Sequence, residues 1–180
     1  VFDAYEVQSN PWGLPADTRG DWAKELGVPL VRDFTDVTGL DYLFYVGSAE
    51  SFDPRGQKIA RAFAKVLQAA GVRFGILGPR ESSTGECVRR AGNEMLFQQL
   101  AGQLVETLNE LGVTRIVTCD PHAFNSLKNE YPEFGGRWEV LHHTQLLARL
   151  LAEGRIRVAP TLERVILHEP CYLGRHNGEY

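Results

Sequence analysis

Apolar runs that end in small or polar residues recur along the chain. Three examples read YLFYVGS (residues 42–48), FGILGPRESSTGECVRR (74–90) and RIVTCDPHAF (115–124). A helical pattern follows each run, which is the strand-then-helix rhythm of a parallel sheet. Ligands of such sheets bind outside the carboxyl ends of the strands. The three strand ends are therefore predicted to deliver their polar residues to one candidate site.

The same patterning predicts a complete set of elements. Helical periodicity, such as the leucines at 100, 104, 108 and 111, indicates helices over residues 17–26, 57–70, 92–111, 123–129 and 145–152. Apolar runs indicate strands over residues 41–47, 72–77, 113–119, 138–141 and 164–168. We expect an α/β fold with a parallel sheet of four or five strands flanked by helices.

The order of these elements suggests three segments. Residues 1–40 are rich in turn formers and predict an irregular lead-in arm, and residues 41–160 predict one α/β domain. Cys171 follows the predicted strand 164–168 as Ser48 follows the first strand, 123 residues earlier. Residues 161–180 are therefore interpreted as the first strand and ligand loop of a truncated second repeat. The first residue is Val, which favours an excised piece of a longer protein.

Composition narrows the function classes. The 180 residues carry a formal charge of −4, which argues against a nucleic-acid surface, and no apolar run is long enough to cross a membrane. Three widely spaced cysteines do not form a disulfide framework and favour a reducing compartment. The first strand lacks the glycine fingerprint of dinucleotide enzymes, and no Ser lies in a hydrolase elbow.

Several long stretches allow a family to be named. NPWGLP, YLFYVGSAESFDPR, RRAGNEMLFQQLA, PHAFNSLKNEYPEFGG and HEPCYLGRHNG resemble the cysteine-rich (CCG) domains of heterodisulfide-reductase-like iron–sulfur oxidoreductases. The chain is especially similar to large bacterial, membrane-associated members. The resemblance implies a Rossmann-like fold. Its implied partners are a second CCG repeat and ferredoxin-like modules of a parent protein, electron-transfer flavoprotein, and quinone at the cytoplasmic side of a membrane.

The resemblance also implies a set of ligand positions. In the family, a Cys after the first strand, a Cys-Cys-Gly and a Cys-x-x-Cys hold an iron–sulfur cluster. This sequence keeps the spacing, with 34 residues between Ser48 and Ser83 and 34 between Gly85 and Asp120, but replaces every thiol. The substituted slots are Ser48, Ser83, Thr84, Asp120 and Ala123. Hydroxyls are poor iron ligands. We therefore expect a cluster-free first repeat, and Cys171 matches the first slot of the second.

A second hypothesis keeps a metal in this chain. Cys87, Cys119 and His122 lie near the predicted strand ends and could form a mixed zinc site together with Asp120, His142 or His143. Neighbouring strand residues face opposite ways, however, so only one of Cys119 and Asp120 is expected to face the site. In this reading the chain is a redox-inert, zinc-binding interaction module.

The hypotheses assign different roles to the chain. The preferred one makes it a scaffold or docking domain of an iron–sulfur oxidoreductase, not catalytic by itself. A third, in which Ser48 and Ser83 are engineered replacements of cysteine, is disfavoured because Asp120 and Ala123 would be unusual choices.

Overall fold

The computed structural model describes residues 2–160 and 163–180, and its centre is a sheet of four parallel strands in the order β2-β1-β3-β4. The strands are β1 (Tyr42–Tyr45), β2 (Phe74–Gly75), β3 (Arg115–Thr118) and β4 (Glu139–His142). β1 pairs with β3 through Leu43 and Ile116, and β3 pairs with β4 through Ile116 and Val140. The predicted α/β fold is confirmed.

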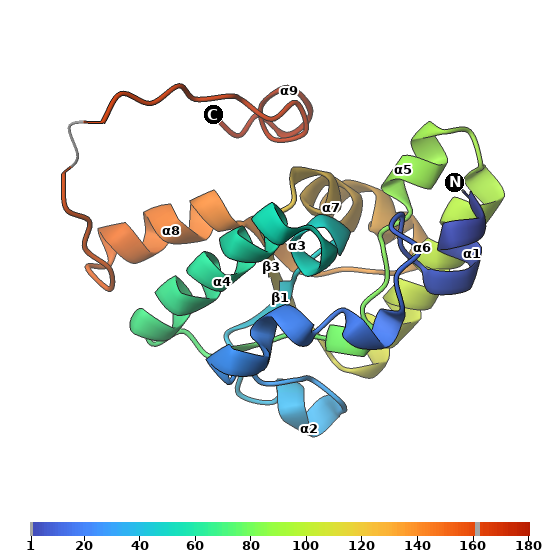
Figure 1. Cartoon of the computed structure of the whole chain (residues 1–180), viewed down its shortest axis with the longest axis horizontal. Coiled ribbons are helices and arrows are strands. Elements are labelled where there is room, and N and C mark those ends of the chain that lie inside the picture. The colour runs from blue at the N-terminus through green and yellow to red at the C-terminus, as the bar shows by residue number, and fades with distance from the viewer. Residues whose placement is uncertain (1, 161–162) are drawn as a thin grey trace.

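Helices cover both faces of the sheet (Figure 1). The α-helices are α1 (Phe2–Gln8), α2 (Phe34–Val37), α3 (Ser48–Phe52), α4 (Pro54–Ala69), α5 (Glu86–Arg90), α6 (Glu94–Glu110), α7 (Pro121–Asn125), α8 (His143–Ala152) and α9 (Gly174–Asn177). Short 3-10 helices span Ala16–Thr18, Asp21–Leu26, Gly78–Arg80 and Tyr131–Phe134, and a π-helical turn spans Ser126–Glu130.

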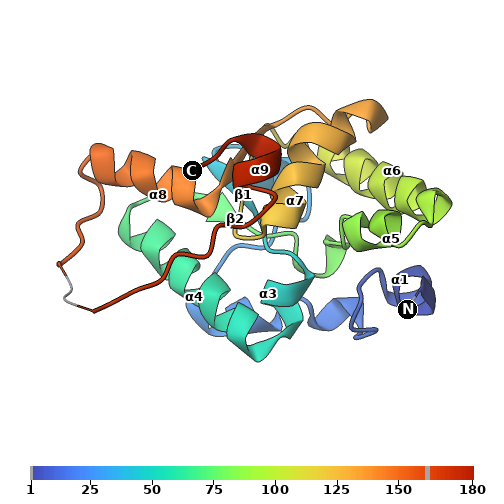
Figure 2. The same ribbon diagram turned by 90° about the horizontal axis from the view of Figure 1, so that it is seen from above.

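The strands are apolar because both of their faces are buried. Side chains alternate along β1, so Phe44 packs toward α4 and α8 while Leu43 and Tyr45 pack toward α6 and α7. Figure 2 shows α4 and α8 on one side of the strands and α6 on the other. Because the four strands are parallel, their carboxyl ends meet at one edge of the sheet, as the sequence predicted.

The lead-in is more regular than predicted. Residues 2–8 form helix α1, whose Tyr5 is buried against Val88, Leu96 and Leu100. The predicted helix 17–26 is instead two 3-10 turns, the second of which buries Trp22 against Phe44. These contacts with the main body explain why the segment is ordered despite its turn-forming sequence.

The predicted fifth strand is wrong. Residues 164–168 form no strand within the described chain, and Val165, Ile166 and Leu167 are 82%, 98% and 90% exposed. A strand needs a hydrogen-bonding neighbour, and the sheet offers this segment none. The predicted boundary between 160 and 161 touches residues 161–162, which lie outside the described ranges, so the domain limits stay predictions.

The end of the chain returns to the main body. Asn177 donates from Nδ2 to Asn125 Oδ1 on α7, and Leu173 is buried with the core cluster next to α6 and α7. Among residues 2–160 and 163–180, no helix combines the length and apolar content that a bilayer crossing requires.

Candidate functional site

The three predicted strand ends do converge on one cavity of about 240 Å³. Ser48 begins α3 after β1, Ser83 and Thr84 lie in the loop before α5, and Asp120 caps α7 after β3. Aromatic residues, carboxylates, a thiol and an imidazole complete the wall. Beyond those four residues, the lining includes Tyr5, Trp12, Tyr45, Gly47, Glu50, Glu86, Cys87 and His122.

A buried ion pair forms the base of this site. Arg19 Nη1 lies 3.0 Å from Glu81 Oε1, and the side chains of both residues are almost fully buried. Glu81 also accepts the backbone N–H groups of Val46 and Gly47, each at 2.9 Å. Arg19 donates from Nη2 to Ser48 Oγ at 2.9 Å. The pair thus joins the lead-in, the end of β1 and the loop after β2.

The loop of Ser83, Thr84 and Gly85, predicted to match the family's Cys-Cys-Gly, is held by its backbone. Gly85 has φ +72°, and a Cβ there would meet Leu100 and Phe97 at 3.3 Å. Tyr131 donates its hydroxyl to Thr84 O at 3.0 Å, and Ser83 N–H donates to Ser9 O at 2.8 Å. Both the left-handed angle and the tight packing require glycine at position 85.

Glu86 is the most connected carboxylate of the wall. His122 Nδ1 lies 3.1 Å from Glu86 Oε2, while Tyr172 and Arg90 both hydrogen-bond to Oε1. Burial acts to raise the pKa of Glu86, but the hydrogen bonds with His122 and Tyr172 outweigh it and lower that pKa to about 2. The same contact with Glu86 raises the pKa of His122. Glu86 is therefore a charged carboxylate that holds His122, Tyr172 and Arg90 at the rim of the cavity.

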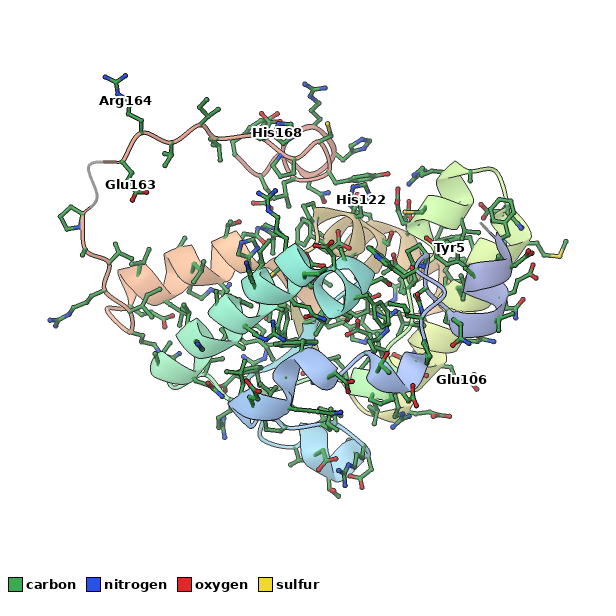
Figure 3. The ribbon with its side chains drawn as sticks, in the orientation of Figure 1. Tyr5, Glu106, His122, Glu163, Arg164 and His168 are labelled. Carbon is green, nitrogen blue, oxygen red and sulfur yellow. The ribbon has the colours of Figure 1, made fainter. Side chains whose placement is uncertain are left out.

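Two other carboxyls of the wall behave in the opposite way. Burial, then the nearby charge of Asp120, raises the pKa of Glu50 to about 7. Burial also raises the pKa of Asp120, whose Oδ1 accepts the N–H of His122 at 2.8 Å. Figure 3 labels His122 on α7 and Tyr5 on α1, two of the elements that contribute residues to the wall.

The predicted site residues divide between the cavity and the core. Ser48, Ser83, Thr84, Asp120, Cys87 and His122 all line the cavity. Ala123 is buried in the core next to Phe124 and does not line it. Cys119 lies in the opposite core, where burial raises its pKa, so Asp120 alone of that pair faces the site, as expected.

The histidine pair and Cys171 also lie outside the wall. His142 is buried with Nε2 3.1 Å from Cys119 O, and His143 Nδ1 lies 3.1 Å from His142 Nε2. His142 thus contacts the backbone, and His143 packs beside Phe63. Cys171 is exposed, but the next residue, Tyr172, packs its ring 4.5 Å from that of His122.

The donor set does not fit the cluster that the resemblance implies. Cys87 is the one thiol in the cavity wall, and its pKa is raised by burial and by Glu86. Within the described ranges, no three His, Cys, Asp or Glu side chains are grouped so that they could hold a metal ion. Cys87, Cys119 and His122 accordingly do not form a common ligand set there.

Sequence reasoning missed Arg19, Glu50, Glu81 and Glu86. A weak signal existed for two of them, because Glu50 and Glu81 lie within a few residues of the predicted strand ends at 47 and 77. No sequence signal pointed to Arg19, because its partner Glu81 is 62 positions away along the chain.

Comparisons with known proteins identify a domain and several relatives. Residues 42–128 match the CCG cysteine-rich domain. The chain is 47% identical over its full length to a probable iron-sulfur-binding oxidoreductase, FadF, of Bacillus subtilis, covering 26% of that protein. It is 42% identical over its full length to EtfAB:quinone oxidoreductase of Syntrophomonas wolfei, also covering 26%.

A more distant relative comes from an archaeon. Over 78% of its length the chain is 30% identical to a dihydromethanophenazine:CoB–CoM heterodisulfide reductase polypeptide of Methanosarcina barkeri, covering 36% of that polypeptide. The chain thus spans about a quarter to a third of the length of these relatives. No solved structure is significantly similar.

The ion pair gives the first testable prediction. Arg19→Met keeps the apolar stem but leaves Glu81 buried without its partner, so it should lower the free energy of unfolding by about 3–5 kcal/mol. Arg73→Met is the matched control, because the Arg73–Asp41 pair is exposed and worth about 0–1 kcal/mol. Urea unfolding measures both. Adding Glu81→Gln to Arg19→Met should cost less than the two single changes together. Equal losses in Arg19→Met and Arg73→Met would contradict the assignment.

Glu50 gives the second prediction. Its folded pKa, about 7, exceeds its ordinary value of 4.5, so folding takes up a proton between these pH values. Wild-type stability should therefore fall as pH rises through this window, by up to about 3 kcal/mol relative to Glu50→Gln. Glu106→Gln, on the exposed side of α6, should follow the wild-type profile. Thermal unfolding between pH 4.5 and pH 8 measures this, and superimposable profiles of wild type and Glu50→Gln would refute it.

The relatives of this chain include an iron–sulfur-binding oxidoreductase, a quinone oxidoreductase and a heterodisulfide reductase. Residues 42–128 of the chain form a CCG cysteine-rich domain.

Proposed function

We propose that this chain is the cluster-free first repeat of a heterodisulfide-reductase-like iron–sulfur oxidoreductase, and that it serves as a scaffold and docking domain. The observation that carries the proposal is the cavity wall. Four of the five substituted ligand slots, Ser48, Ser83, Thr84 and Asp120, surround one space and bring hydroxyl and carboxyl groups to it. Such groups stabilise one another through hydrogen bonds and bind iron–sulfur clusters poorly.

The position of Tyr172 supports a docking role. Cys171, which matches the first ligand slot of a second repeat, is followed directly by Tyr172, and Tyr172 hydrogen-bonds to Glu86 in the cavity wall. Arg90 donates to the same hydroxyl at 2.9 Å. In this proposal, the first repeat fixes the place of the second repeat's ligand loop through the rim of its own former cluster site.

Partners and location follow from the relatives in the same way. The name of the Syntrophomonas protein, EtfAB:quinone oxidoreductase, supports electron-transfer flavoprotein and quinone as partners of a parent protein. Since quinones reside in membranes, the parent would work at the cytoplasmic side of one. The second CCG repeat and ferredoxin-like modules of that parent would hold the clusters, and this chain alone would not be catalytic.

Metal analysis tests the cluster-free proposal. The chain purified without oxygen, and then incubated with iron and sulfide, should show neither cluster absorption in the visible range nor stoichiometric iron. The physical reason is that the cavity wall offers one thiol, Cys87. Iron and sulfide that are retained by the wild type and lost in Cys87→Ser would overturn the proposal. Zinc that survives dialysis would instead favour the alternative, a zinc-binding interaction module.

Tyr172→Phe tests the docking role. The variant removes the hydroxyl that joins Glu86 and Arg90 but keeps the ring beside His122. Backbone amides of α9 should then exchange hydrogen faster, by about three- to tenfold for one lost charge-assisted hydrogen bond. Tyr180→Phe is the control, because Tyr180 is exposed. Unchanged protection of residues 173–178 in Tyr172→Phe would show that the contact does not hold the segment.

A further inference from the structure

Glu50 is a buried carboxylate whose role the preceding proposals leave open. Its side chain begins on α3, two residues after Ser48, and the residue is 9% exposed. Within the part of the chain that the structure describes, its Oε2 has no hydrogen-bond partner. Burying an acceptor without a donor costs free energy, more so when the group is charged. The position is therefore suited to a donor that comes from outside.

The unpartnered oxygen faces a second carboxylate. A Cβ placed on Gly47 would lie 3.2 Å from Glu50 Oε2 and 3.4 Å from Asp120 Oδ2, so both oxygens border the same space beside Gly47. Gly47 has φ +88°, which together with the missing side chain keeps this space open. Two carboxylate oxygens thus converge on one corner of the cavity.

The charges of the wall are not balanced. Glu50, Asp120 and Glu86 line the cavity, and neither Lys nor Arg is among its described lining residues. Glu86 is paired with Arg90 and His122. Arg19, below the floor, is paired with Glu81. At the corner that Glu50 and Asp120 share, Asp120 accepts the N–H of His122, and Glu50 Oε2 is the acceptor left without a donor in the described chain.

The remaining wall suits a flat, cationic group. Trp12, Tyr5 and Tyr45 contribute aromatic surface, and Trp12 is 44% exposed where the wall reaches solvent. Cations bind favourably over aromatic faces. A cavity of about 240 Å³ holds a small head group rather than a drug-sized ligand. A guanidinium is planar, carries five N–H donors and matches carboxylates in pairs.

We propose that this cavity is a binding site for a guanidinium group, which Glu50 and Asp120 receive at the corner beside Gly47 and Trp12 covers from the rim. The group could be carried by a small alkylguanidine or by an arginine side chain of a bound protein, since the recognising chemistry is the same. The inference concerns occupancy of the cavity and does not depend on the role of the second repeat.

Titration calorimetry of the 180-residue chain with propylguanidinium chloride tests this at constant ionic strength. Propylguanidinium should bind, and Glu50→Gln should weaken binding about tenfold or more, the expected effect of losing one charge-assisted hydrogen bond. Glu106→Gln removes the same charge from the exposed side of α6, and should bind as the wild type does (Figure 3). Trp12→Ala should also weaken binding.

Two further probes distinguish the carrier of the guanidinium group and test whether binding needs N–H donors. Tighter binding of the peptide acetyl-Gly-Arg-Gly-amide than of propylguanidinium would support a protein arginine, and the reverse order would support a small guanidine. Tetramethylammonium has the same charge but no N–H donor and should not bind. Equal binding of tetramethylammonium, equal binding to Glu50→Gln and wild type, or no binding of either guanidinium probe would overturn the proposal.

Discussion

The buried pair of Arg19 and Glu81 is the interaction on which the rest of the site depends. Glu81 accepts two N–H groups from the end of β1, and Arg19 brings the lead-in to the same point and contacts Ser48. These contacts join three segments that are distant in sequence at one point beneath the cavity. Since the two opposite charges pair with each other, Arg19 does not offset the carboxylates that line the cavity above it.

Much of the fold was predictable, because the spacing of apolar residues along the chain follows which side chains are buried. The four paired strands and the long helices α4 and α6 lie where the apolar patterns placed them, within a few residues at each end. The failed strand at 164–168 has a plain reason. An apolar run shows only that its residues are suited to burial. A strand also needs a neighbouring strand to bond with, and the described chain does not supply one for residues 164–168.

The site was predictable only in part. Convergence of Ser48, Ser83 and Asp120 follows from the topology of a parallel sheet, whatever the side chains are. The pairing of Arg19 with Glu81 and the isolation of Glu50 depend on how loops pack, which local patterns do not encode. Ala123 illustrates the same limit, because its spacing matched a ligand slot while its side chain packs in the core.

Gly85 has a further consequence for how such domains are recognised. Where the resemblance places the family's Cys-Cys-Gly, this chain has Ser83, Thr84 and Gly85, and Gly85 combines a positive φ with close packing against α6. Ligand chemistry and backbone shape are therefore separable features of the same short motif. The match of residues 42–128 to the cysteine-rich domain accordingly does not require thiols at positions 83 and 84.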